Sequence, residues 1–222
     1  MTLSTRIAAT SAALLLAVAP NAWGAAAAGA SDDAVSFFRW IDTDNAAGIE
    51  RLLKAGFDPN TRDDHGQVGL FVALRAHSLQ AARVLWEAPA TQVDATNAAN
   101  ETPLMIAAMR GEPDAVQVLL AHGAAVNRAG WSPLHYAATG GSVEAIKLLL
   151  AHGAALDARS PNASTPLMMA AKYGSDDAVE VLLAAGADRR LRNDLEMDAA
   201  AFAASAGREK LAMRLKAMPP GS

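Results

Sequence analysis

A glycine recurs along the chain at a nearly constant interval, and this repeat limits the fold more than any other feature of the sequence. The glycines that follow an Ala-rich pair are Gly111, Gly141, Gly174 and Gly207, at intervals of 30, 33 and 33 residues. Two other series keep the first two intervals, namely Gly123, Gly153 and Gly186, and Pro103, Pro133 and Pro166. Self-similarity with a period of about 20–50 residues predicts an architecture of stacked repeat units.

Each repeat predicts a pair of helices. Thr102 and Thr165 can cap a helix whose first residue is proline, where the missing N–H costs no hydrogen bond. The Ala-Ala pair lets helices of neighbouring units approach closely, and the glycine after it is expected to end the helix in a left-handed turn. A Val/Leu/Leu stripe at helical spacing, as in "VQVLLAHG", is expected to bury against the next unit.

The three central units contain "TPLMIAAMRG", "SPLHYAATGG" and "TPLMMAAKYG", which begin at residues 102, 132 and 165. These segments resemble ankyrin repeats, and weaker copies extend the resemblance over nearly all of the chain after residue 32. The resemblance implies an all-α ankyrin-repeat solenoid of about six helix-turn-helix units, two of them caps, with short projecting hairpin loops. It also implies a module that binds another protein and has no catalysis of its own.

We expect one domain over residues 32–218, with units at approximately 32–62, 63–96, 97–127, 128–159, 160–192 and 193–218. Terminal units should differ from central ones, because one side of each faces water. In the first unit "SFFRWI" replaces the usual helix start, and its large side chains are expected to close the core: Phe37, Phe38, Trp40 and Ile41. In the last unit cations decorate the predicted outer helix: Arg208, Lys210, Arg214 and Lys216.

Residues 1–24 have the features of a secretory signal peptide. Arg6 precedes an apolar run, and the small residues Ala22 and Gly24 stand just ahead of a cleavage point. The apolar run is shorter than the roughly 20 residues that span a bilayer. We therefore expect no stable membrane anchor after cleavage, with an uncleaved anchor as the alternative. Residues 25–31 are interpreted as a flexible lead-in.

Cleavage after Gly24 would remove one cation and no acid, which changes the net charge from -4 to -5. An acidic protein is not a general nucleic-acid binder. The chain has no cysteine, so its stability must come from packing even in an oxidising compartment. An Ala-rich, cysteine-free chain behind a short signal predicts the periplasm, with secretion as the alternative.

Catalytic and metal-binding signals are weak. "GWSPL" begins like a nucleophile elbow, but Leu134 stands where the second glycine belongs and Ser132 occupies a helix-cap position. "DTDNAAGIE" from Asp42 lacks the glycine and glutamate of a calcium loop at the required positions, so a loop between two helices is expected. His122 and His152 should lie about 10 Å apart, too far to share one metal ion. We predict no catalytic residue, no cofactor and no metal site.

The remaining histidines and the recurring arginines are interpreted as mostly structural. His135 fills the histidine position of the family motif, where the resemblance implies that it braces the turn by hydrogen bonds. His65 and His77 have no partner visible in the sequence. The arginines that follow the Asn or Asp ending a unit are typical of the family: Arg62, Arg128, Arg159 and Arg190.

The predicted binding surface comprises the concave inner-helix face and the loop tips. The concave residues are Arg75, Met109, Arg110, Thr139, Lys172 and Tyr173. The loop tips add Asp64, His65, Gln67, Glu101, Trp131, Asn162, Ser164 and Glu196. The concave set holds three cations, a Met expected to be exposed, and no carboxylate, and Arg, Met and aromatic residues are enriched in interfaces. We predict a basic, partly aromatic groove that takes an acidic protein segment; ordinary solvated positions are the alternative.

The loop before Pro133 is three residues shorter than its counterpart before Pro166 and carries Trp131. The deletion falls in the projecting loop and leaves both helices intact. Two interpretations stay open. Trp131 folds back over apolar surface that a full loop would shield, which we favour, or it stays exposed as an anchor for a partner.

The sequence therefore predicts an exported, monomeric, non-catalytic protein that binds a protein partner. Our first expectation is support of an envelope enzyme or complex. Exported bacterial ankyrin proteins of this size are linked to protection against peroxide, so the resemblance implies an oxidative-stress enzyme as one such partner. The alternative is an inhibitor or immunity protein that neutralises a toxic enzyme. A hidden enzyme, with a closed pocket of converging polar groups, is the third class.

Overall fold

A computed structural model describes residues 32–218 of the chain, and the predicted signal peptide (1–24) and lead-in (25–31) lie outside the described residues. The described residues form twelve helices: α1 (Asp32–Asp42), α2 (Ala46–Lys54), α3 (Gly69–Ala76), α4 (Leu79–Glu87), α5 (Pro103–Arg110), α6 (Pro113–Ala121), α7 (Pro133–Gly140), α8 (Val143–Ala151), α9 (Pro166–Tyr173), α10 (Asp176–Ala184), α11 (Ala199–Ser205) and α12 (Glu209–Ala217). Within residues 32–218, none of these helices is long and apolar enough to cross a membrane.

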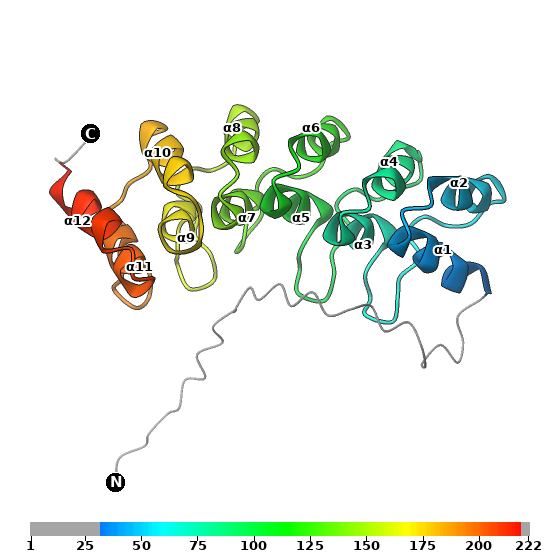
Figure 1. The fold of residues 1–222 in the computed structure, drawn as a ribbon, viewed down its shortest axis with the longest axis horizontal. Coiled ribbons are helices and arrows are strands. Elements are labelled where there is room, and N and C mark those ends of the chain that lie inside the picture. The colour runs from blue at the N-terminus through cyan, green and yellow to red at the C-terminus, as the bar shows by residue number, and fades with distance from the viewer. Residues whose placement is uncertain (1–31, 219–222) are drawn as a thin grey trace, which may run out of the picture.

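The helices stack in two rows, as Figure 1 shows. The odd-numbered helices form an inner row and the even-numbered helices an outer row, and the long loops project from the inner side. Consecutive inner helices contact one another along the stack, from α1 against α3 to α9 against α11. The predicted all-α solenoid is confirmed.

The helix starts follow from the Thr-Pro pairs. Thr102 and Thr165 have extended backbones, and their hydroxyl oxygens accept the N–H of Met105 at 3.3 Å and of Met168 at 3.4 Å. Proline occupies the first turn of both helices. The predicted caps are therefore confirmed, and each satisfies an N–H that the helix itself leaves unpaired.

The helix ends agree with the prediction at three of the four glycines. Gly111, Gly141 and Gly207 have φ of 68°, 71° and 73°, in the left-handed region. The left-handed turn predicted at Gly174 is wrong, because its φ is -84° and its ψ -170°, which is extended backbone.

Arg208 explains the exception at Gly174. After α7 the chain satisfies its own carbonyl, since the Ser142 N–H reaches Ala137 O at 3.2 Å. After α9 the Arg208 side chain does this instead: its Nη1 donates to the carbonyls of Ala170, Ala171 and Gly174 at 2.9, 3.0 and 2.9 Å. The guanidinium also pairs with Asp176. The last unit thus supplies the hydrogen-bond donors for the carbonyls at the C-terminal end of α9, in the unit before it.

Polar side chains also join successive units. In each of the first four units, the Asn or Asp near the end accepts a backbone N–H from the turn after the next outer helix: Asn60 from Gln92 at 2.8 Å, Asp94 from Ala125 at 3.1 Å, Asn127 from Ala155 at 2.8 Å and Asp157 from Asp188 at 3.2 Å. The spacing of these contacts follows the repeat. Each bond sets the register between one unit and its neighbour.

The first unit closes the core with aromatic side chains, as expected. Phe37, Phe38 and Ile41 are buried, and the two Phe rings pack edge to face at 5.1 Å between centroids. Trp40 is half-buried and lies over Gly48, where a Cβ would overlap its ring. The segment from Asp42 that was compared with a calcium loop connects α1 to α2, as expected. Within it, the Asn45 side chain caps α2 by accepting the Gly48 N–H at 3.0 Å.

His135 braces the start of α7 from a fully buried position. Its Nε2 lies 3.0 Å from the Ser164 carbonyl, while Nδ1 lies 3.2 Å from the Ser132 N and 2.8 Å from the Ser132 hydroxyl. The neutral ring, with its proton on Nε2, satisfies these contacts. Burial lowers the pKa of His135 from 6.5 to about 4. Ser132 is also buried, so this Ser-His contact is closed to solvent and braces the start of α7.

We expect Arg208→Met to destabilise the protein by about 2 kcal/mol, because three carbonyls lose a charged donor while the apolar stem is kept. Chemical unfolding at pH 7 measures the change. Lys210→Met is the matched control, since Lys210 is exposed in the first turn of α12, just after Arg208. Equal stability of the two variants would show that Arg208 does not hold the end of α9.

We expect stability to fall as the pH drops from about 6.5 to about 4, because in this window His135 is protonated in the unfolded chain but stays neutral in the folded protein. The loss is about 3 kcal/mol at the acid end. The double variant Ser132→Thr/His135→Met copies the pairs Thr102/Met105 and Thr165/Met168, and should lose this part of the pH dependence. Urea unfolding at pH 7, 5.5 and 4.5 tests it; the same slope in both proteins would contradict the assignment.

Candidate functional site

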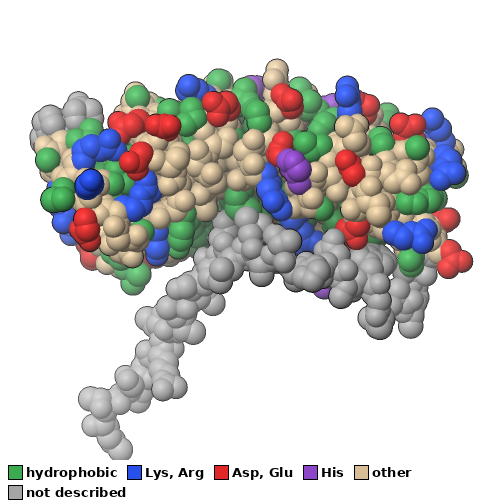
Figure 2. Space-filling view, in the orientation of Figure 1, with side chains coloured by type: hydrophobic (Ala, Val, Ile, Leu, Met, Phe, Trp, Pro, Cys, Tyr) green, Lys and Arg blue, Asp and Glu red, His purple; other side chains and the backbone are tan. Residues whose placement is uncertain are grey.

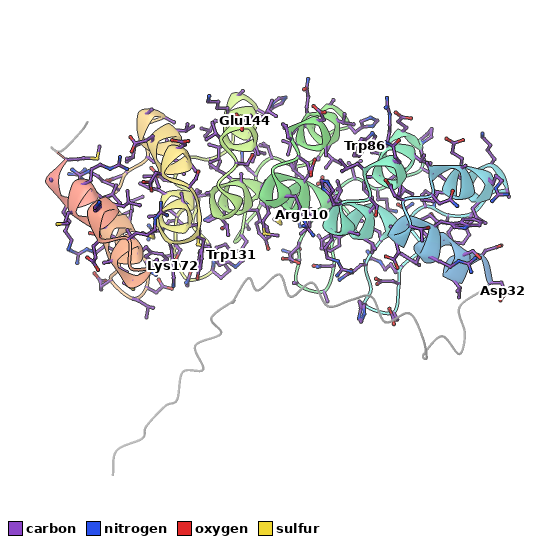
Figure 3. All side chains as sticks on the ribbon, in the orientation of Figure 1. Asp32, Trp86, Arg110, Trp131, Glu144 and Lys172 are labelled. Atoms are coloured by element: carbon purple, nitrogen blue, oxygen red, sulfur yellow. The ribbon has the colours of Figure 1, made fainter. Side chains whose placement is uncertain are left out.

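The predicted concave residues lie at the C-terminal ends of four successive inner helices. Arg75 belongs to α3, Met109 and Arg110 to α5, Thr139 to α7, and Lys172 and Tyr173 to α9. Figure 3 shows the labelled Arg110 and Lys172 on the inner row, with Trp131 beside the projecting loops. Because α5 contacts α7 and α7 contacts α9, these positions share one face of the stack.

The arginines of this face are partly engaged within the protein. Arg110 donates through Nη2 to the backbone carbonyl of Arg75, which ties the end of α5 to the end of α3. Arg75 lies close enough to Asp42 of α1 to lower the pKa of that carboxyl, although burial raises this pKa overall. The prediction of a concave face without carboxylates is therefore incomplete at its N-terminal end. Asp42 comes from the cap unit, which lacks the repeat motif, so the alignment could not place it there.

Tyr173 is the one exposed residue among the six predicted concave positions, and its neighbour Lys172 is half-buried. The Tyr173 side chain is 51% exposed. The Lys172 ammonium lies 5.1 Å from the centroid of the Tyr173 ring and 5.8 Å from that of Phe202 in α11. Cation–π contacts at these distances hold the ammonium in place.

Met109 and Thr139 are less available than the sequence suggested, and the neighbouring Gly140 packs against the end of α5. Met109 is half-buried and packs against the core, so the expected exposed Met is wrong. The Thr139 hydroxyl donates to the His135 carbonyl of its own helix at 2.8 Å. At Gly140 a Cβ would overlap the Met109 carbonyl oxygen, so only glycine permits this approach of α7 to α5.

The loop-tip side chains differ in exposure. Asp64, His65 and Asn162 are exposed, although Asn162 accepts the Ser160 hydroxyl at 2.6 Å. Glu101 accepts the Tyr136 hydroxyl at 2.7 Å. Ser164, predicted as a loop tip, is 1% exposed and lies beneath the His135 ring, so its place on the binding surface is wrong.

Trp131 folds back onto the protein. It is half-buried, packs against the core, and meets His135 edge to face with ring centroids 5.3 Å apart. This placement agrees with the covering interpretation. Its loop, 122–132, is three residues shorter than the loops 152–165 and 185–198.

The recurring arginines connect neighbouring hairpins. Arg62 donates to the Thr96 carbonyl at 2.8 Å, Arg128 to the Asn100 side chain at 3.1 Å, and Arg159 to the Arg192 carbonyl at 2.7 Å. Arg190 instead pairs with Asp188 within its own loop, at 3.2 Å. The structural interpretation is thus confirmed for the three that cross between hairpins.

Two exposed apolar side chains were not singled out in the sequence: Leu195, 72% exposed in the last hairpin, and Met213, 63% exposed on α12. Leu195 follows the loop-tip pattern of the other hairpins, so the alignment placed Leu195 in the tip but gave no reason to select it. Its position extends the predicted surface toward the C-terminal end of the stack.

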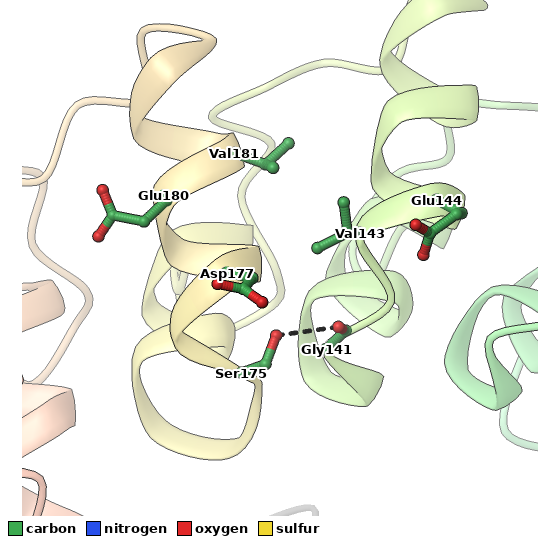
Figure 4. A pocket seen from close by; sticks show the side chains of 7 residues that line it. All are labelled: Gly141, Val143, Glu144, Ser175, Asp177, Glu180 and Val181. Atoms are coloured by element: carbon green, nitrogen blue, oxygen red, sulfur yellow. Dashed lines mark hydrogen bonds between the residues drawn. The ribbon is translucent and has the colours of Figure 1, made fainter.

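A cleft also opens between the outer helices α8 and α10. Its lining residues are Gly141, Val143, Glu144, Ser175, Asp177, Glu180 and Val181. Figure 4 shows the carboxylate of Glu180 turned away from the cleft, and this group pairs with Arg214 at 2.5 Å. Figure 2 shows acidic side chains gathered over the outer helices at this end of the stack. Asp177 and Glu144 lie in the first turns of α10 and α8, where helix dipoles favour carboxylates.

Over residues 32–218, no group of three or more His, Asp or Glu side chains is placed to hold a metal ion. His77, for which the sequence showed no partner, pairs with Glu112 at 2.7 Å, and His65 lies 3.7 Å from Asp64. These are two-residue surface contacts. The residues that the sequence predicted as a site carry charged, aromatic and small side chains, and none of them lines the cleft between α8 and α10.

Comparison with known proteins identifies the repeats. A sequence profile described as Ankyrin repeats (3 copies) matches residues 40–129, 90–160 and 125–193. Human neurogenic locus notch homolog protein 4 is 38% identical over 71 residues, which are 32% of this chain and 4% of that protein. The chain thus spans a small fraction of this relative's length, and the likeness concerns repeats alone. With the profile covering most of the stack that the structure shows, the chain belongs to the ankyrin-repeat family.

Proposed function

We propose that this chain is a non-catalytic module that binds a protein partner through its loop tips and its concave inner-helix face. Ankyrin repeats generally serve as protein–protein interaction modules. The observation that supports this surface best is the pair Lys172 and Tyr173, where a half-exposed aromatic ring and a held ammonium stand side by side. Aromatic side chains of this kind anchor protein interfaces.

We further propose that the module works as a monomer in the periplasm, or after secretion, and supports an enzyme or complex of the cell envelope. The support for export is the pattern of residues 1–24, with Arg6, an apolar run and a small-residue cleavage point. Identification of the partner separates an envelope or oxidative-stress enzyme from a toxic enzyme that the chain would neutralise.

We expect export and cleavage after Gly24 when the full chain is produced in a Gram-negative bacterium. The measurements are fractionation of the cells and sequencing of the new N-terminus. Replacing Leu14, Leu15 and Leu16 by Gln is the control, because it removes the apolar run and should leave the uncleaved chain in the cytoplasm. Full-length chain in the cytoplasm, or in the membrane, would contradict the proposal.

We expect Lys172→Glu to weaken partner capture at least tenfold, because it reverses the charge beside Tyr173. The partner is identified by a photo-crosslinking residue at position 173 in cells of the source organism, and its binding is then titrated with purified protein. Lys147→Glu is the matched control, since Lys147 is exposed on the outer helix α8. Absence of a crosslink from position 173, or equal binding by both variants, would place the partner elsewhere.

A further inference from the structure

The projecting hairpin loops are tied to one another by arginine side chains, with one exception. Arg62 in the first loop donates to the Thr96 carbonyl in the second loop at 2.8 Å. Arg128 in the short loop 122–132 donates backward, to the Asn100 side chain in the second loop at 3.1 Å. The arginine of the short loop therefore ties this loop to the loop before it and not to the loop after it.

The last two loops, 152–165 and 185–198, are tied to each other at several points. Beyond the repeated bond between Asp157 and Asp188, three hydrogen bonds join them: the Arg159 side chain to the Arg192 carbonyl at 2.7 Å, the Asp194 N–H to the Asn162 carbonyl at 3.1 Å, and the Asn193 side chain to the Ser164 hydroxyl at 3.3 Å. The second of the three joins the backbones of the two loops directly. We call these two loops the paired hairpins, because neither can move far alone without breaking these bonds.

The short loop and the paired hairpins face each other across a weaker junction. At the outer turn, Asn127 donates to the Gly153 carbonyl and accepts the Ala155 N–H, both at 2.8 Å. Nearer the tips, Gly130 has no side chain to offer: an added Cβ would lie 3.5 Å from Pro161, which is ordinary van der Waals contact. The tip of the short loop thus leaves this contact unmade.

One side chain spans the junction at the hairpin itself. The His135 Nε2 of α7 lies 3.0 Å from the Ser164 carbonyl, to which the neutral ring donates. Within the described part of the chain, His135 is the one side chain of α7 or of loop 122–132 with a hydrogen bond to residues 158–165. The Ser164 carbonyl also accepts the Ser160 N–H at 3.0 Å, so His135 holds the point where the hairpin closes.

The two ways of opening the hairpin row differ in what they break. Separating the paired hairpins from each other breaks the three bonds that join them and the bond between Asp157 and Asp188. Separating them from α7 breaks the bond from His135 and leaves the Asn127 contacts at the outer turn in place. Local openings occur where the fewest contacts are lost, so the second opening is favoured, and it moves both hairpins together.

We propose that the hairpin row contains one hinge: the paired hairpins swing away from α7 as one body, and the His135–Ser164 hydrogen bond is the latch that holds them closed. The paired hairpins carry the exposed side chains of Asn162, Leu195 and Glu196. A partner that contacts loop tips on both sides of the junction keeps the latch closed, so the hinge couples partner binding to the order of the last two loops. The hinge itself does not depend on the proposed function.

The test measures distances between loop tips with pairs of spin labels, which the cysteine-free chain accepts at introduced cysteines. Ala99→Cys is paired with Ala163→Cys and, separately, with Leu195→Cys, and both pairs span the junction. Asp64→Cys with Ala129→Cys is the control, because this pair also joins loops two units apart but lies on one side of the junction. Double electron–electron resonance gives the distribution of distances for each pair at pH 7.

The variant Ser132→Thr/His135→Met removes the latch and copies the helix cap that Thr102 and Met105 form in the preceding unit. Circular dichroism confirms that it folds, and His135→Leu takes its place if it does not. We expect the distributions of both spanning pairs to at least double in width, while that of the control pair stays unchanged. Ser132→Thr alone keeps His135 and should leave all three distributions unchanged.

Unchanged widths for the spanning pairs would overturn the latch. Equal broadening of the control pair would show a general loosening and overturn the hinge, and broadening of only one spanning pair would overturn the motion of the paired hairpins as one body. None of these outcomes affects crosslinking of a partner at position 173, so the hinge can fail while the proposed function stands.

Discussion

Each unit of this protein can bury its apolar face only against the next unit, and the close contact between inner helices makes this burial possible. Ala-Ala pairs form that contact, and Ala107, Ala108, Ala137, Ala138, Ala170 and Ala171 are all fully buried. Small side chains let the backbones approach until the larger Leu and Ile residues behind them interlock. Gly140 is the extreme case, because α7 meets the α5 backbone where even a methyl group would overlap a carbonyl oxygen.

Polar contacts between units fix the register of the whole stack. The terminal Asn or Asp of one unit holds a backbone N–H of the next, and Arg62 and Arg159 each reach a carbonyl of the following hairpin. A single such bond contributes about 1 kcal/mol, but a slip of one unit would break several at once. The loops therefore stay aligned as a row, which a binding surface made of loop tips requires.

The repeat made most of the fold predictable, because the same short-range rules act in every unit. The caps at Thr102 and Thr165 and the left-handed glycines follow from residues within one helix. Features that depend on another unit were missed. The turn at Gly174 changes because Arg208, a residue of the cap unit, supplies the donors that the turn would otherwise provide.

The predicted binding face likewise has features that the repeat predicts and features that depend on another unit. Its location follows from the repeat alignment, since equivalent positions on successive helices face the same way. The exposure of each side chain does not follow from the alignment, because it depends on contacts across units. Ser164 is hidden by His135 of the preceding unit, and Arg75 is offset by Asp42 of the cap. The short loop is visible in the sequence, but the close approach of Gly140 to the end of α5 appears only in the packed stack.

The short hairpin loop and the buried His135 occur in the same unit and are structurally linked. The units on either side place Met105 and Met168 where this unit has His135, and a thioether cannot reach across to the next hairpin. A loop that is three residues short leaves the following hairpin with less support on that side, and the His135 Nε2 donates to the Ser164 carbonyl in that hairpin. Trp131 covers the histidine from the solvent side and keeps its ring dry. The cost is a buried base that disfavours protonation, so this unit loses stability in acid.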